Sequence, residues 1–200
     1  MSIKAVYFDL GGVIIRTGDK TARTRLAAEF GMSYDEMDHF VFECETAQLA
    51  SIGKISESAH WLEVTRRLNR PESEMPRIKA AFFGGDSADQ EILDWLRSLR
   101  KTHKTGLISN AWDGLRPWII EHKFEDAFDH LTISAEVGIA KPDARIYAYA
   151  LEQLGVNAAE AIFVDDVQKN ITGCEALGMH GVLFKTSDQA LAEVKQLLKT

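Results

Sequence analysis

The sequence IKAVYFDLGG, residues 3–12, decides the fold that we predict for this chain. Ile3 to Phe8 form a short run of β-branched and aromatic residues, which favours a buried strand. Asp9 ends the run, and Gly11-Gly12 are typical of a tight turn. Four other short apolar runs resemble this one, with the last two weaker than the others: 105–108, 161–164, 131–133 and 181–184.

Helical periods separate these runs. Ile92, Trp95, Leu96 and Leu99 follow an i, i+3, i+4, i+7 spacing, and a comparable stripe in 146–154 ends at a glycine. Strands that alternate with helices predict an α/β fold, in which helices cover both faces of a parallel sheet.

Residues 17–85 break this alternation, because they contain no convincing strand. Ser33 and Glu36 have the spacing of a capping box, and Pro71 suits the first turn of a helix. We therefore predict an all-helical insert after the first strand, with helices near 19–30, 33–50, 56–69 and 71–83.

Composition narrows the class of protein. The chain has 200 residues and a net charge of −7, from 23 Lys and Arg against 30 Asp and Glu, and the charges are scattered. No basic track favours nucleic acid or anionic lipid, and no apolar run is long enough to cross a membrane. Cys44 and Cys174 lie far apart, which argues against a disulfide framework and fits a reducing compartment. We expect a cytoplasmic protein, monomeric or weakly dimeric.

Polar residues end three of the predicted strands. Ligands of an open parallel sheet bind beyond the carboxyl ends of its strands, so these residues should meet there. Three carboxylates in one place repel one another unless a cation is shared, and Mg²⁺ is a hard cation suited to oxygen ligands. An ammonium, a hydroxyl and the amides after the first strand suit a phosphate. The expected cluster contains Asp9, Ser109, Asn110, Asp165 and Asp166, with Lys141 from a loop.

The sequence resembles the haloacid dehalogenase-like (HAD) hydrolase superfamily. Four segments stand in the order and approximate spacing of that family's motifs: 8–14, 107–110, 141–143 and 163–166. The resemblance implies a Rossmann-like core of residues 1–16 and 86–200. It also implies that residues 17–85 form a helical cap that closes over a small-molecule substrate.

The resemblance also assigns roles to residues. It implies that Asp9 attacks phosphorus in a small phosphate ester and becomes an aspartyl phosphate, and that Ser109, Asn110 and Lys141 bind the phosphoryl group. Mg²⁺ would be bound by Asp9, Asp166 and the carbonyl of Gly11, with Asp165 assisting directly or through water. The implied activity is a magnesium-dependent phosphatase.

Gly11 departs from the family pattern. Phosphatases of this family usually carry a second Asp at this position as general acid and base, worth roughly 10²- to 10⁴-fold in rate. Without it, substrates with easily departing leaving groups are favoured, and sugar 1-phosphates are one such class. Asp113 is a candidate substitute acid, although a helix N-cap is the more ordinary role for it.

Two alternatives remain open at this point. An L-2-haloacid dehalogenase also uses an Asp nucleophile, but it needs no metal and leaves the acidic pair Asp165-Asp166 without a purpose. A catalytically weakened binding protein could keep the fold without the activity. His60 and the tryptophans, including Trp112 and Trp118, are predicted to be helix or packing residues.

Overall fold

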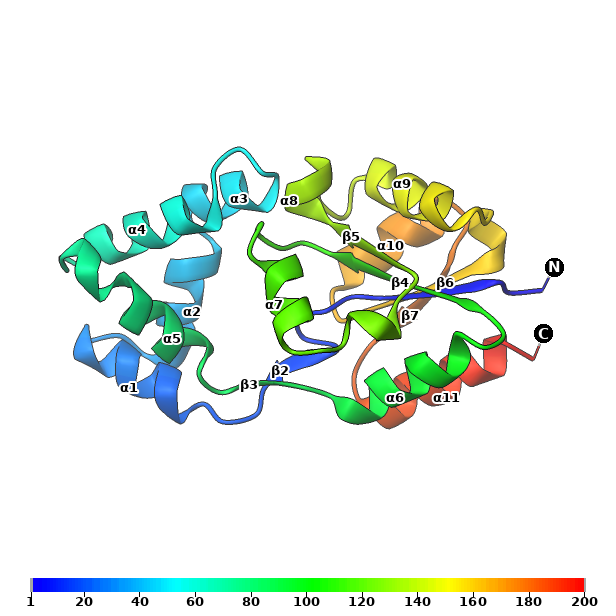
Figure 1. The fold of residues 1–200 in the computed structure, drawn as a ribbon, viewed down its shortest axis with the longest axis horizontal. Helices are drawn as coiled ribbons and strands as arrows, with labels where there is room; N and C mark the ends of the chain where they lie inside the picture. Colours follow the sequence, from blue (N-terminus) through cyan, green and yellow to red (C-terminus); the bar gives the residue numbers. More distant parts are fainter. Residues whose placement is uncertain (1, 200) are drawn as a thin grey trace.

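A five-stranded parallel sheet forms the centre of the larger of two lobes in the computed structural model, which describes residues 2–199 (Figure 1). The strand order is β5-β4-β1-β6-β7, and all four pairings are parallel. Each predicted apolar run lies in this sheet, which confirms the α/β fold class. The strands are β1 (Ala5–Phe8), β4 (Lys104–Ser109), β5 (His130–Ile133), β6 (Ala161–Asp165) and β7 (His180–Leu183).

Alternation along β1 divides the core of this sheet lobe into two layers. Val6 and Phe8 pack on the face covered by α6 (Gln90–Leu99), α7 (Leu115–Glu121) and α11 (Ser187–Leu197). Ala5 and Tyr7 pack on the opposite face, under α9 (Ala144–Leu154) and α10 (Gln168–Ala176). Because both faces are buried, the strands are mostly apolar. Shorter elements are α8 (Ser134–Val137), η2 (Glu125–Ala127) and η3 (Ala158–Glu160).

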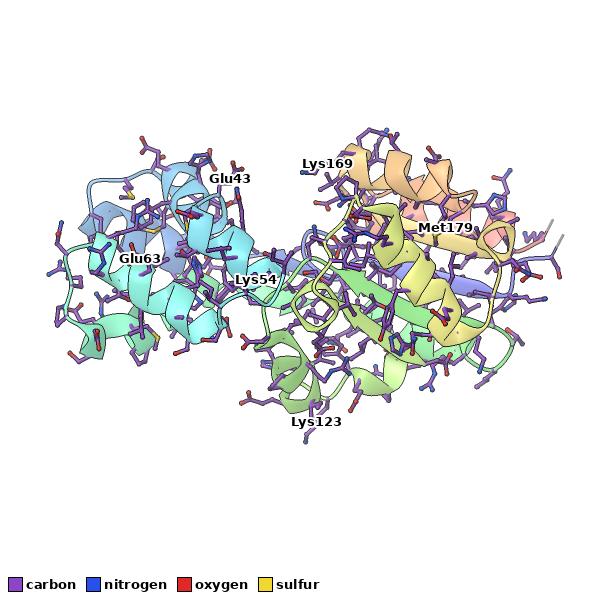
Figure 2. All side chains as sticks on the ribbon, turned by 90° about the horizontal axis from the view of Figure 1, so that it is seen from above. Glu43, Lys54, Glu63, Lys123, Lys169 and Met179 are labelled. Carbon is purple, nitrogen blue, oxygen red and sulfur yellow. The ribbon has the colours of Figure 1, made fainter. Side chains whose placement is uncertain are left out.

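The second lobe is helical and has its own apolar cluster. Its buried centre includes Leu26, Met37, Trp61, Val64 and Phe82. Figure 2 shows this lobe beside the sheet lobe, with Lys54 close to the junction. Its elements are α1 (Thr21–Glu29), α2 (Tyr34–Phe42), α3 (Glu45–Ser51), α4 (Glu57–Arg67), η1 (Glu72–Glu74) and α5 (Met75–Phe83).

The sequence interpretation of this lobe was correct about the helices but wrong in two details. The helix predicted over 33–50 is two helices, because Cys44 adopts an extended conformation and begins α3. Pro71 precedes a 3₁₀ turn rather than entering a helix, and Pro76 occupies the first turn of α5. The capping box of Ser33 and Glu36 is confirmed.

Two connections join the lobes on opposite sides. On one side, β2 (Ile15–Thr17) and β3 (Asp86–Ala88) pair as an antiparallel ribbon, which the sequence interpretation missed. On the other, Trp112 follows β4 and inserts into the helical cluster, where its Nε1 donates to the Ala47 carbonyl at 3.2 Å. Within residues 2–199, no helix has the length and apolar character needed to cross a bilayer.

Candidate active site

The carboxyl ends of three adjacent strands bring the predicted site residues together. β1 lies between β4 and β6, and the Asp9 amide donates to the Val164 carbonyl at 2.8 Å. Asp9 therefore follows β1 beside Asp165 at the end of β6. The chain continues from β1 to β4 and β5 on one side of the sheet and then crosses to β6 and β7 on the other, so the end of β1 is at the switch point where α/β sheets bind ligands.

Lys141 is the cation at the centre of this crevice. Its Nζ lies 2.9 Å from Asp9 Oδ1 and 2.7 Å from Asp165 Oδ2. The lysine side chain is 1% exposed, and the Asp165 side chain is fully buried. A buried ammonium that contacts two carboxylates is held firmly, because removing the ammonium would leave two buried negative charges without a counterion.

Asp165 is fixed by neighbours from its own chain segment. Its Oδ1 accepts from the Val167 amide at 2.8 Å, and Asn170 Nδ2 donates to both carboxylate oxygens at 3.1 Å. Asp165 thus supports the start of α10 while it also orients Lys141. The sequence analysis did not single out Asn170. Its position five residues after Asp165, on the buried face of a helix that starts at Gln168, was the available signal.

Asn110 supports Lys141 from the opposite side. Its Nδ2 donates to the Lys141 carbonyl at 2.9 Å, and its Oδ1 accepts from the Lys141 amide at 2.7 Å. Both ends of the amide are therefore engaged with one residue of the loop. Ser109 is 3% exposed, and both Ser109 and Asn110 line the cavity described below.

Asp166 completes a group of three carboxylates. One oxygen from each of Asp9, Asp165 and Asp166 lies within 4.8 Å of the others, and Asp166 is the exposed member. A Cβ at Gly12 would lie 2.1 Å from Asp166 Oδ2, so only glycine admits this carboxylate there. Gly12 also has φ +78°, which favours glycine.

The charges of this group are not balanced. Burial raises the pKa of Asp9 to about 6, against the lowering effect of Lys141 and with a smaller increase from Asp165. Burial, followed by repulsion from Asp165, also raises the pKa of Asp166. One ammonium cannot neutralise three carboxylates, so the donor set fits an added divalent cation with oxygen ligands.

The backbone conformation and the space around Gly11 do not explain why a glycine is present. Unlike that of Gly12, its φ lies outside the positive range, and a Cβ built on it meets nothing within 4 Å. The backbone at this position therefore does not require glycine. A side chain would fit here, and none is present.

Asp113, the candidate substitute acid, is engaged elsewhere. Its Oδ1 accepts from the amide of Glu57, the first residue of α4, at 2.8 Å. It therefore caps a helix, as expected from its residue type, but the helix belongs to the other lobe. With Trp112 beside it, the loop after β4 attaches the helical lobe to the sheet lobe.

A cavity of about 1150 Å³ lies between the lobes. The backbone after β1 contributes Gly11 and Gly12 to its wall, and β4 contributes Ser109. The helical lobe contributes Phe42, Phe83 and other residues. The phosphate-suited end of the crevice and the helical lobe therefore line one space, which is large enough for a small-molecule ligand.

Comparison with known proteins agrees with this geometry. A family model described as haloacid dehalogenase-like hydrolase matches residues 3–178. A sesquiterpene phosphatase of Aspergillus oryzae is 28% identical over 98% of this chain and 97% of its own length. A D-ribitol-5-phosphate phosphatase of Bacteroides thetaiotaomicron is 27% identical over 88% of this chain and 89% of its own length.

A solved structure shares the fold. It is a HAD family enzyme from Bacteroides thetaiotaomicron, in complex with magnesium and inorganic phosphate. It has a TM-score of 0.78 and 23% identity, and the match covers 92% of this chain and 96% of the other. Because the family model matches most of the chain, including the helical lobe and every residue of the crevice, this chain belongs to the haloacid dehalogenase-like hydrolases.

Proposed function

We propose that this hydrolase is a magnesium-dependent phosphatase that transfers the phosphoryl group of a small monoester to Asp9. The observation that carries the proposal is the buried Asp9 carboxylate, held 2.9 Å from Lys141 Nζ beside two further carboxylates. Carboxylates serve as nucleophiles in phosphoryl transfer when cations offset the charge of the phosphoryl oxygens.

The geometry of Asp9 supports attack by one particular oxygen. Its Oδ1 accepts from the Leu10 amide at 2.7 Å and contacts Lys141. Among residues 2–199 both contacts fall on Oδ1, so Oδ2 is the oxygen that we assign to phosphorus. Its bond to phosphorus forms as the ester P–O bond breaks, and the alkoxide takes a proton from solvent. Water then hydrolyses the acyl phosphate, which releases inorganic phosphate and restores the carboxylate.

The proposed metal site uses the remaining oxygens. Asp9, Asp166 and the Gly11 carbonyl would hold Mg²⁺, with Asp165 assisting directly or through water. When bound, Mg²⁺ supplies positive charge that offsets the phosphoryl oxygens. The Bacteroides enzyme that was solved with magnesium and phosphate supports magnesium as the metal.

The other predicted residues bind the phosphoryl group or position the residues that bind it. Ser109 and Lys141 bind phosphoryl oxygens, and Asn110 acts through the Lys141 backbone, to which it makes both of its hydrogen bonds. We further propose that residues 17–85 act as the cap and that the remainder is the core. We also propose that the protein is cytoplasmic and is a monomer or a weak homodimer. Sedimentation tests the oligomeric state.

The missing acid at Gly11 constrains the ester. An ester whose leaving oxygen is stabilised needs little protonation, and a sugar 1-phosphate meets this condition. The relatives named above act on a sesquiterpene phosphate and on ribitol 5-phosphate by their names, which differ widely in polarity. The relatives therefore support a phosphomonoester as the substrate, but they do not specify its organic part.

One assay separates the proposal from its alternatives. Phosphate release from phenyl phosphate, acetyl phosphate and sugar phosphates is measured with Mg²⁺ and with excess chelator, next to chloride release from 2-chloropropionate. Metal-dependent phosphate release supports the phosphatase. Chloride release that survives the chelator identifies the dehalogenase, and no release from any compound identifies the weakened binding protein.

A further inference from the structure

The cavity between the lobes extends well beyond the phosphate end. Its volume of about 1150 Å³ exceeds the range of about 300–1,000 Å³ that is typical of ligand pockets. In the proposed function, phosphate would occupy only the end of the cavity that is lined by Gly11, Gly12 and Ser109. The rest of the wall therefore selects the organic part of the substrate.

The cationic side chains of that wall are already paired with carboxylates. Arg23 contacts Asp38 at 2.6 Å and Asp86 at 3.3 Å, and Lys79 contacts Glu57 at 2.8 Å.

Arg16, the third lysine or arginine among the described lining residues, is paired with Asp89. Arg23 uses further donors on the Phe82 carbonyl and the Tyr34 hydroxyl. A polyhydroxylated substrate gains specificity from polar groups that are free to bind it. The three lysine and arginine side chains of the described wall are therefore already neutralised by carboxylates before a ligand binds.

Several apolar side chains of the wall are partly exposed, although Trp112 itself is buried. Phe42 is 43% exposed although it is a large apolar residue, and it faces this cavity. Its ring centroid lies 5.6 Å from that of Trp112 and 6.5 Å from that of Phe83. Met75, Leu115 and Trp118 extend the same apolar wall. An apolar surface of this kind gains free energy when a ligand removes it from water.

We propose that the substrate is a phosphomonoester with an extended apolar organic part, which lies along Phe42, Phe83, Trp112 and Trp118. The inference rests on the proposed phosphatase function, since the phosphate end of the cavity fixes the other end of the molecule. It names the organic part as hydrocarbon in character and rejects a sugar as the preferred leaving alcohol.

The test is a series of 4-alkylphenyl phosphates, from methyl to octyl, assayed with Mg²⁺. The leaving-group pKa is nearly constant along this series, so changes in kcat/KM report the alkyl chain alone. We expect kcat/KM to rise roughly two- to fourfold for each of the first added methylenes, because a buried methylene is worth about 0.8 kcal/mol. Counterparts with a terminal hydroxyl and the same length should lose part of this gain.

Variants test whether the dependence of kcat/KM on chain length arises in the cavity. Phe42→Ala should flatten the dependence on chain length, and Phe42→Leu should restore part of it. Ile120→Ala is the matched control, since Ile120 is 51% exposed but does not line the cavity, and it should leave the slope unchanged. Binding of octylphosphonate, measured by calorimetry, gives a readout that does not depend on turnover. Its heat-capacity change should be negative and smaller in Phe42→Ala.

The outcomes distinguish this inference from the proposed function. A flat or falling slope, or a higher kcat/KM for glucose 1-phosphate than for every alkylphenyl phosphate, overturns the apolar substrate while leaving the phosphatase intact. Failure to hydrolyse acetyl phosphate as well as the whole series overturns the phosphatase itself. Equal slopes in Phe42→Ala and wild type place the apolar site elsewhere and also refute the assignment.

Discussion

At the scale of single residues, Asp9 combines two demands that conflict. A nucleophilic carboxylate must be ionised, whereas burial penalises the charged form and raises its pKa to about 6. Lys141 opposes this penalty through its contact at 2.9 Å. The site therefore holds a carboxylate that is costly to bury, which is typical of functional positions.

We expect Asp9→Asn to abolish turnover while the fold persists, since the amide is close in shape but cannot attack phosphorus. In chelator at pH 7 its melting temperature should equal or exceed that of the wild type, because the amide avoids the cost of a buried charge. Steady-state kinetics and thermal unfolding measure both effects. A variant that keeps more than a tenth of kcat has lost less than about 1.4 kcal/mol and refutes the nucleophile.

Gly11→Asp tests what the missing acid costs. The open space around Gly11 admits the side chain without backbone strain. In the wild type, rates should fall steeply as the leaving-group pKa rises, because the oxygen departs with its charge. The variant should flatten this dependence and help poor leaving groups most. A set of aryl and alkyl phosphates gives both slopes, and a shallow slope already present in the wild type shows that another group donates the proton.

At the scale of elements, the sheet was predictable and the connections were not. The strands are short apolar runs buried on both faces, so their pattern is strong. β2 and β3 are three residues each, only partly buried, and paired across the whole insert. No local pattern distinguishes such a ribbon from a loop. The break between α2 and α3 at Cys44 has no sequence signal either, since residues on both sides of it favour helix.

His60 makes the stability of α4 dependent on pH. Burial, and to a lesser extent Arg67, lowers the pKa of His60 to about 4. An unfolded histidine titrates near 6.5, so between these values the unfolded state binds more protons. The contribution of His60 to stability should therefore be complete above about pH 6.5 and be lost, by the order of 3 kcal/mol, as the pH drops to about 4.

Denaturant unfolding at several pH values, followed by tryptophan fluorescence, measures this dependence. Trp112 and Trp61 are suitable reporters, with ring centroids 4.5 Å and 5.7 Å from His60. His60→Gln should flatten the slope between pH 6.5 and 4, whereas His122→Gln, at an exposed histidine, serves as the control. The same slope in His60→Gln and wild type assigns the acid sensitivity to other groups.

At the scale of the whole molecule, the site is formed by segments that are distant in sequence. The motif positions predicted where the strands end. Because the strands are parallel, these ends meet at one edge of the sheet, which was enough to predict that Asp9, Ser109 and Asp165 lie close together. The insertion of Trp112 into the helical lobe and the cap that Asp113 provides for α4 depend on how two lobes dock. Such contacts join surfaces with separate cores, and no periodicity within either segment encodes them.

Magnesium should couple the crevice to the stability of the whole chain. A ligand that binds only the folded state stabilises it by about 2.7 kcal/mol at one hundred times its Kd. Mg²⁺ should therefore raise the melting temperature of the chelated protein, and calorimetry should show one site. Asp166→Ala should weaken binding at least tenfold, because it removes the exposed carboxylate of the group.

Asp143→Asn is the matched control for that variant. Asp143 belongs to the same motif as Lys141, but its carboxylate pairs with Arg145 at 2.6 Å rather than with the crevice. The amide can still cap α9, so the response to Mg²⁺ should persist. If Mg²⁺ leaves the melting temperature unchanged, or if Asp166→Ala binds it as tightly as Asp143→Asn does, the three carboxylates are not a magnesium site. Their repulsion must then be relieved by protons, and the raised pKa values of Asp9 and Asp166 mark where those protons bind.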